Sequence, residues 1–212
     1  MNHASYQRGW VSDLMYQFPC KPPTTDVCLF SGRCAARTGW LSAPRRVTLR
    51  SHPVEKRMDF RISALPAAHF EHLFGRADAD LALQGARRMR ADRSPGFPCR
   101  VSLEDAAPGE AVLLVNYEHL PADTPYRSRY AIFVREGARQ AHPATNEVPQ
   151  QLRQRLLSVR AFDAGHMLLD AEVTPGAALE PLMARLFAEP RVAYLHLHNA
   201  KPGCYAARVE RA

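Results

Sequence analysis

Apolar and polar residues alternate with a period of two in short runs after residue 57, and this pattern predicts β-strands. The most hydrophobic run, residues 111–117, predicts a strand that is buried on both faces. The other predicted strands cover residues 60–62, 87–92, 99–103, 130–135, 159–162, 167–173, 192–198 and 204–210. Turns rich in Gly and Pro separate several of these strands, so many of them follow one another directly.

Helical periodicity is clearest between Thr174-Pro175, which can cap a helix, and Pro190, which stops one. The apolar residues there recur at the spacing i, i+3, i+4, i+7, i+8, namely Leu179, Leu182, Met183, Leu186 and Phe187. Shorter helices are predicted after Pro66, after Asp78 and over residues 149–157. Because strands outnumber helices, the sequence predicts an α+β fold, a mostly antiparallel sheet with a few short helices packed on it.

Residues 1–57 differ from the rest of the chain because they show neither helical nor strand periodicity over a useful length. They hold nine Lys and Arg against three Asp and Glu, so most of the formal net charge of +7 belongs to them. A well-patterned segment begins at Met58. We therefore expect residues 58–212 to form a single globular domain. Residues 1–57 are predicted to be a disordered extension, or upstream sequence read in frame before a translation start at Met58.

Composition excludes several classes of function. The segment after residue 57 is nearly neutral, which disfavours a nucleic-acid partner. No apolar run has the length of a membrane span, and no signal peptide precedes the domain. The five cysteines are too few and too irregularly spaced for a disulfide framework, and the spacing of Cys20, Cys28 and Cys34 does not fit a zinc site. These features predict a soluble cytoplasmic protein.

The pair Cys99-Arg100 follows a predicted turn and is the first candidate for chemistry. A thiol beside a guanidinium can be held as a thiolate and act as a nucleophile or a redox group. Neighbours on a strand point to opposite faces, however, so Arg100 would need a bulge to lie over Cys99. The alternative is a buried cysteine that acts as a small hydrophobic residue.

The last predicted hairpin is the second candidate. Its first strand alternates Tyr194, His196 and His198 on one face with leucines on the other. A five-residue loop that begins at Asn199 would set His198 opposite Cys204 and His196 opposite Ala206. Imidazoles and a thiol on one face can bind zinc or copper or form a Cys-His catalytic pair, whereas the alternative is a solvated polar face. We assign catalytic roles to Cys99, Arg100, His198 and Cys204, and no metal ligand.

The segment Tyr126-Arg127-Ser128-Arg129 is the third candidate, because closely spaced arginines suit a carboxylate or a phosphate. It suggests a small anionic molecule as the partner, and surface solvation is the alternative. The residues assigned to ligand binding are Tyr126, Arg127, Arg129, His196 and Asn199. The sequence lacks a Gly-rich phosphate loop, a His-Glu-x-x-His helix and a Gly-x-Ser-x-Gly elbow, so it names no cofactor.

Three segments together resemble a small bacterial family of unknown function, domain of unknown function 1203. They are residues 95–103 (PGFPCRVSL), 125–135 (PYRSRYAIFVR) and 196–204 (HLHNAKPGC). The resemblance covers about residues 58–211, and it departs at Tyr130-Ala131, where members often carry Gly-Pro. It implies a domain boundary and brings no activity.

The leading hypothesis for function is a small-molecule-binding domain, and an enzyme that uses the Cys/His/Arg site is its sharper form. A non-catalytic protein-interaction or regulatory module is the alternative. A pocket that holds both cysteine-bearing segments favours the first hypothesis, and a flat face with Cys99 buried favours the second.

Overall fold

The computed structural model describes residues 58–212, all of which lie in one compact unit. The expectations for residues 1–57, including a disordered or untranslated extension and the zinc spacing of its cysteines, concern the part of the chain outside the described residues. No helix in the described part is long and apolar enough to cross a membrane.

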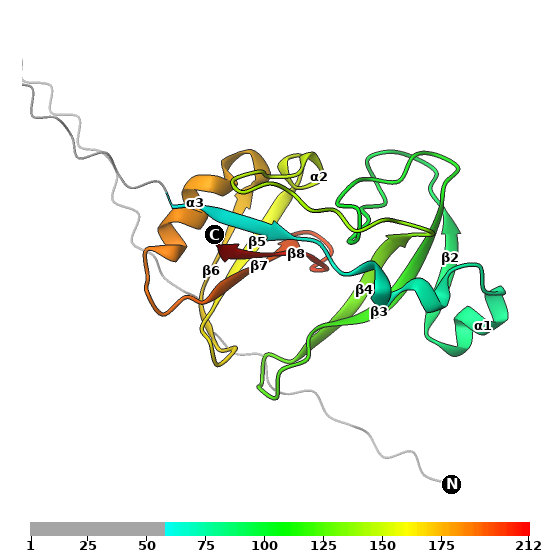
Figure 1. The fold of residues 1–212 in the computed structure, drawn as a ribbon, viewed down its shortest axis with the longest axis horizontal. Coiled ribbons are helices and arrows are strands. Elements are labelled where there is room, and N and C mark those ends of the chain that lie inside the picture. Colours follow the sequence, from blue (N-terminus) through cyan, green and yellow to red (C-terminus); the bar gives the residue numbers. More distant parts are fainter. Residues whose placement is uncertain (1–57) are drawn as a thin grey trace, which may run out of the picture. The chain divides into compact units, whose positions relative to one another are not determined.

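The larger of two sheets has five strands in the order β1-β8-β7-β5-β6, and every neighbouring pair is antiparallel. Its strands are β1 (Phe60–Ser63), β5 (Leu156–Phe162), β6 (Leu168–Pro175), β7 (Tyr194–Asn199) and β8 (Tyr205–Arg211). The helix α3 (Leu179–Phe187) covers one face, and all five of its predicted apolar residues are buried in the core of this sheet. Figure 1 shows α3 beside β6 and β7.

The smaller sheet has three antiparallel strands in the order β2-β3-β4. They are β2 (Ala86–Arg90), β3 (Ala111–Leu120) and β4 (Ser128–Arg135). The short helix α1 (Asp78–Leu83) precedes β2 and buries Leu81 in a second apolar cluster. That cluster also contains Tyr205 of β8, so the two sheets share packed side chains.

Three predicted elements differ from the structure. The helix predicted after Pro66 is two 3-10 turns, Ala67–His69 and Glu71–Leu73. The helix predicted over 149–157 is the single turn α2 (Gln150–Arg153), because the chain enters β5 soon afterwards. The strand predicted over 99–103 is wrong, since only isolated bridges form there, between Cys99 and Phe133 and between Pro98 and Asp105. A 3-10 turn, Gly176–Ala178, also precedes α3.

The fold is therefore mostly antiparallel sheet with a few short helices, as the sequence predicts. Three strand pairs in the described part contain a register shift: β3 with β4, β5 with β6, and β7 with β8. Bulges of this kind bend a strand and redirect side chains. All three lie at the same place in the molecule, around the side chains of the candidate site.

Candidate functional site

The strand β7 separates two different environments. Leu195 and Leu197 point into the apolar core under α3, so the predicted alternation is confirmed. His196 and His198 point to the other side, yet they are only 2% and 1% exposed. The alternative of a solvated polar face is therefore wrong. The face is polar and buried, which requires other elements to cover it.

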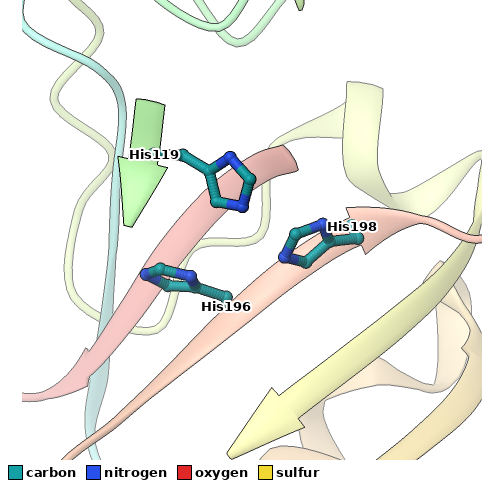
Figure 2. Close-up of side chains that lie close together, drawn as sticks. All are labelled: His119, His196 and His198. Carbon is teal, nitrogen blue, oxygen red and sulfur yellow. The ribbon is translucent and has the colours of Figure 1, made fainter. Parts of the chain in front are cut away.

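One of the covering residues is His119, near the end of β3 in the other sheet. Glu118 pairs with Arg129 and Leu120 pairs with Ser128, so His119 is the extra residue of a bulge. The ligand nitrogens of His119, His196 and His198 all lie within 4.8 Å of one another. Figure 2 shows that one nitrogen of each ring faces the other two. Within residues 58–212, this is the one group of His, Cys, Asp or Glu side chains close enough together to hold a metal ion.

The other two register shifts shape the same place. His198 pairs with Tyr205 while Leu197 pairs with Ala207, so Ala206 is the extra residue on β8. In the pairing of β5 with β6, the shift lies at Phe162 and Leu168, both of which line the histidine pocket. Each of the three strand pairs thus departs from regular geometry where it borders the histidines, as is common next to functional sites.

Burial keeps all three imidazoles neutral. It is the main cause that lowers the pKa of His119 to about 4, that of His196 to about 2 and that of His198 to about 3. The positive charge of Arg160 adds to the effect on His119 and His198. A neutral imidazole is the form that binds a metal ion, so no proton has to leave these rings before they act as ligands.

The hydrogen bonds of the imidazole rings also favour metal binding. His198 Nδ1 lies 3.0 Å from the carbonyl oxygen of Gly203, which can only accept, so Nδ1 donates and Nε2 keeps a free lone pair. Gly203 has a φ of 77°, a conformation that favours glycine and aims this carbonyl at the ring. Metal-bound histidines are commonly oriented by such a bond from the second nitrogen. His119 Nδ1 and His196 Nδ1 are buried without a partner in the described residues.

A small cavity of about 120 Å³ opens beside the three rings. Its polar lining outside the histidines comes from Tyr126, Ser128 and Arg160. The rest is apolar, from Leu120, Phe162, Leu168 and Ala171. The cavity is called the histidine pocket below, and it is the space into which a free coordination position of a bound metal would open.

A second and larger cavity of about 570 Å³ holds other predicted residues, Arg100, Asn199 and Cys204. Arg100 is fully buried, and its Nε donates to the carbonyl oxygen of Tyr205 at 2.7 Å. Its Nη2 donates to Cys204 Sγ at 3.0 Å, and the side-chain amide of Asn199 donates to the same sulfur at 3.4 Å. Burial lowers the pKa of Arg100, although the guanidinium has polar partners on each of its nitrogens.

Cys99 lies away from both cavities. It is fully buried, and its sulfur accepts hydrogen bonds from the backbone N–H groups of Ser102 at 3.4 Å and Arg135 at 3.3 Å. Both described cysteines are free, as the sequence predicts. The predicted opposition of His198 and Cys204 is wrong. The backbone N–H of Asn199 donates to the carbonyl oxygen of Cys204, so the loop is one residue shorter than predicted and His198 pairs with Tyr205.

The bulge at Ala206 shifts the register by one more residue and places Arg208, not Ala206, opposite His196. The arginine-rich loop is divided as well. Arg127 forms an ion pair with Glu118 at 2.6 Å, and Arg129 is exposed on β4. Tyr126 alone among the three predicted residues of this loop lines the histidine pocket.

Sequence reasoning therefore brought together His196 and His198 but did not group His119 or Arg160 with them. No local signal marks His119, because its partners lie in another sheet and a bulge, not a regular strand, directs its ring. Arg160 is the cross-strand neighbour of His196 in the pairing of β5 with β7, a relation that the strand order alone reveals. Neither feature can be read from spacing along the chain.

Comparison with known proteins gives one result. The model of a family described as "Protein of unknown function (DUF1203)" matches residues 96–211, a segment that contains all of the histidine pocket. No curated protein and no solved structure matches the chain.

Proposed function

Since the chain belongs to this family of unknown function, we propose from its own geometry that it binds a divalent transition-metal ion through His119, His196 and His198 and presents that ion to a small molecule. This is the small-molecule-binding hypothesis with a specific site. The carrying observation is the convergence of three buried, neutral imidazoles from two sheets on one point.

The spacing supports a metal ion. Three atoms no more than 4.8 Å apart have a common point within about 2.8 Å of each, against a typical Zn–N distance of about 2.0–2.1 Å. Small rotations of the rings would close this difference. Imidazole ligands suit Zn²⁺, Cu²⁺, Ni²⁺ and Fe²⁺, and we take Zn²⁺ as the reference ion.

The ligand set favours an open site over a structural one. Structural zinc sites usually close the coordination sphere with four protein ligands, whereas catalytic sites use three and leave one position for water or substrate. No carboxylate or thiol of the described residues joins the three histidines. A metal held in this way would polarise a bound molecule or lower the pKa of a bound water, so Lewis-acid chemistry is the activity that the site suits.

The chain's own residues would position the reactants. The bond from His198 Nδ1 to Gly203 orients that ring, and Tyr205 stacks on His119 with ring centroids 5.0 Å apart. The apolar side chains of the histidine pocket would exclude bulk water from the open position. Arg100 holds the backbone of Tyr205, and its positive charge also contributes to the low pKa of His198.

The larger cavity supports a second candidate function, binding of a mainly apolar small molecule. Its volume is typical of ligand pockets, and its walls are mostly apolar with a few convergent polar groups. Asn199 Oδ1 is buried there without a partner in the described residues and would accept a hydrogen bond from a ligand. In this cavity Cys204 and Arg100 keep the proposed catalytic role and Asn199 the proposed role in ligand binding. Cys99 fits a role in packing.

Two broader proposals follow from the same residues. Because the site takes side chains from both sheets, we propose that residues 58–212 act as a single domain. Free thiols at Cys99 and Cys204 fit a reducing compartment, which supports a cytoplasmic location.

Calorimetric titration of Zn²⁺ into the full-length, chelator-treated chain tests the metal site. We expect one tight site per chain, lost in His196→Gln and His198→Gln and kept in the control His72→Gln, an exposed histidine outside the cluster. Binding that survives both substitutions would place the metal elsewhere and overturn the proposal.

A further inference from the structure

Arg160 occupies an unusual position in the histidine pocket. It projects from β5 as the cross-strand neighbour of His196 and is half-buried. Within residues 58–212, no ion pair or hydrogen bond engages its guanidinium. Two other arginines, one on β8 and one on α3, have acidic partners. Arg208 pairs with Glu210 at 2.8 Å, and Arg185 pairs with Asp170 at 3.4 Å.

The pocket offers no negative charge to balance this arginine. Its lining consists of three histidines, Arg160, a tyrosine, a serine and four apolar residues, and it contains no carboxylate or thiol. The nearest acidic group on β3, Glu118, is occupied by Arg127. A partly desolvated guanidinium without an anion is unfavourable, and a divalent metal beside it would add further positive charge. An anionic ligand in the pocket would balance both of these charges.

The dimensions limit what this anion can be. The volume of about 120 Å³ corresponds to roughly four water molecules at about 30 Å³ each in the liquid. A nucleotide or a sugar phosphate is too large for this space. The hydroxyl of Ser128 already donates to the carbonyl oxygen of Tyr126 at 2.6 Å, so the free donors of the lining outside the histidines are the charged guanidinium of Arg160 and the hydroxyl of Tyr126.

This donor set distinguishes a carboxylate from a phosphate. A carboxylate has two oxygens, one for the metal and one for the guanidinium, whereas a phosphate brings further oxygens that need donors of their own. The apolar side chains of Leu120, Phe162, Leu168 and Ala171 would contact a hydrogen or a short alkyl group on the carboxylate carbon.

We propose that the histidine pocket binds a small carboxylate, with one oxygen on the metal held by His119, His196 and His198 and the other on Arg160. This inference rests on the proposed metal site and names its ligand class. Arg160 is the specificity-determining residue in this arrangement, since it selects an anion and sets which oxygen faces the metal. It differs from Arg127 and Arg129, the arginines that the sequence singled out.

The test uses the full-length chain loaded with Co²⁺, whose visible absorption reports its ligands. Acetate is titrated in chloride-free buffer, and a saturable spectral change is expected. The Arg160→Gln variant should bind Co²⁺ as the wild type does but bind acetate at least about tenfold more weakly. Arg160→Lys keeps the positive charge but lacks the paired N–H donors of the guanidinium, so it should recover part of the affinity for acetate. The control Arg139→Gln, an exposed arginine that follows β4, should bind acetate as the wild type does.

Two further probes separate charge from size. Imidazole, a neutral ligand, should bind the Co²⁺ of the wild type and of Arg160→Gln within about twofold of each other, because it does not need the guanidinium. Inorganic phosphate should bind more weakly than acetate.

The outcomes distinguish failure of the carboxylate inference from failure of the proposed metal site on which it rests. If the wild-type chain takes up no Co²⁺, the metal proposal fails and the carboxylate proposal fails with it. If Co²⁺ binds but acetate causes no spectral change, or binds equally to wild type and Arg160→Gln, the metal site stands and the carboxylate inference is overturned. Tighter binding of phosphate than of acetate would overturn the ligand class.

Discussion

The two faces of β7 are both buried, but they are buried for different reasons. One face places Leu195 and Leu197 against α3, where each apolar side chain contributes to the core. The other places His196 and His198 against His119 and Tyr205, where burial removes water from groups that prefer it. Burial of the first kind stabilises the fold. Burial of the second kind costs stability and is understandable if the imidazoles have a ligand to bind.

The two faces also differ in whether they bury polar atoms that have no hydrogen-bond partner. The leucine face has no polar atoms to satisfy, whereas the histidine face leaves His119 Nδ1 and His196 Nδ1 without a partner in the described residues. Buried polar atoms without partners are rare and usually mark an ordered water or an ion. Each prediction below alters one face and measures whether the other responds.

The largest effect is expected from the leucine face. Leu195→Ala leaves a cavity in the core and should lower the free energy of unfolding by about 2–5 kcal/mol. The Zn²⁺ affinity of the folded protein should stay the same, because the ligands project from the other face. Urea unfolding and calorimetry measure the two quantities. A loss of Zn²⁺ affinity comparable to that of a histidine substitution would show that the faces are not separable.

The histidine face should give the opposite result. His119→Phe keeps a ring to stack on Tyr205 but removes a ligand, so Zn²⁺ affinity should fall by about 100-fold or more. The free energy of unfolding of the metal-free protein should change by less than about 1 kcal/mol, since the substitution also removes an unpartnered buried nitrogen. His69→Phe is the matched control, because His69 stacks on Tyr117 outside the cluster. Equal Zn²⁺ affinity in both variants would refute the role of His119.

The pH dependence of stability should come from the histidine face. The unfolded chain protonates its histidines near pH 6.5, whereas burial lowers the folded-state pKa of His196 to about 2 and that of His198 to about 3. Below pH 6.5 the unfolded state therefore binds more protons, and the free energy of unfolding of the metal-free protein falls as the pH falls. Each of the two contributes about 1.4 kcal/mol per pH unit between pH 6.5 and its folded-state pKa.

Urea unfolding in a chelating buffer between pH 7.5 and 5 measures this slope. His196→Leu should reduce it by about 1.4 kcal/mol per pH unit. A slope that is unchanged in this variant would mean that His196 is protonated in the folded state.

The smallest expected effect is that of pH on Zn²⁺ affinity. Because the three imidazoles are already neutral, Zn²⁺ affinity should be nearly constant between pH 6 and 8. A site made of ordinary exposed histidines would lose affinity on the acidic side of this range. Competition titrations against a chelator of known pH dependence measure the difference. A marked loss of affinity at pH 6 would contradict the assignment of neutral ligands.

The parts of the fold that could be predicted are those with a local cause. The spacing of Leu179, Leu182 and Leu186 identifies the buried face of α3, and the alternation of His196 and His198 with the leucines identifies the two faces of β7. The segment 99–103 is not a strand although apolar and polar residues alternate in it, because this alternation after a turn is also compatible with a buried loop.

The site itself could be predicted only in part. A five-residue loop would have paired His198 with Cys204, but the loop is one residue shorter, and the bulge at Ala206 then shifts the register of His196 by one more residue. Sequence pattern specifies neither the loop length nor the bulge. His119 meets His196 through the packing of one sheet on another, and Arg160 lies beside His196 because β5 and β7 are neighbours. Contacts between distant segments of this kind depend on topology, which local periodicity does not determine.

X-ray absorption spectroscopy of the Zn²⁺-loaded, full-length chain tests the central claim most directly, because it identifies the atoms bound to the metal. The account predicts a first shell of nitrogen and oxygen at about 2.0–2.1 Å, with the multiple-scattering pattern of three imidazoles. That pattern should weaken in His119→Phe. A shell containing sulfur at about 2.3 Å would instead assign the metal to cysteines and contradict the trihistidine site.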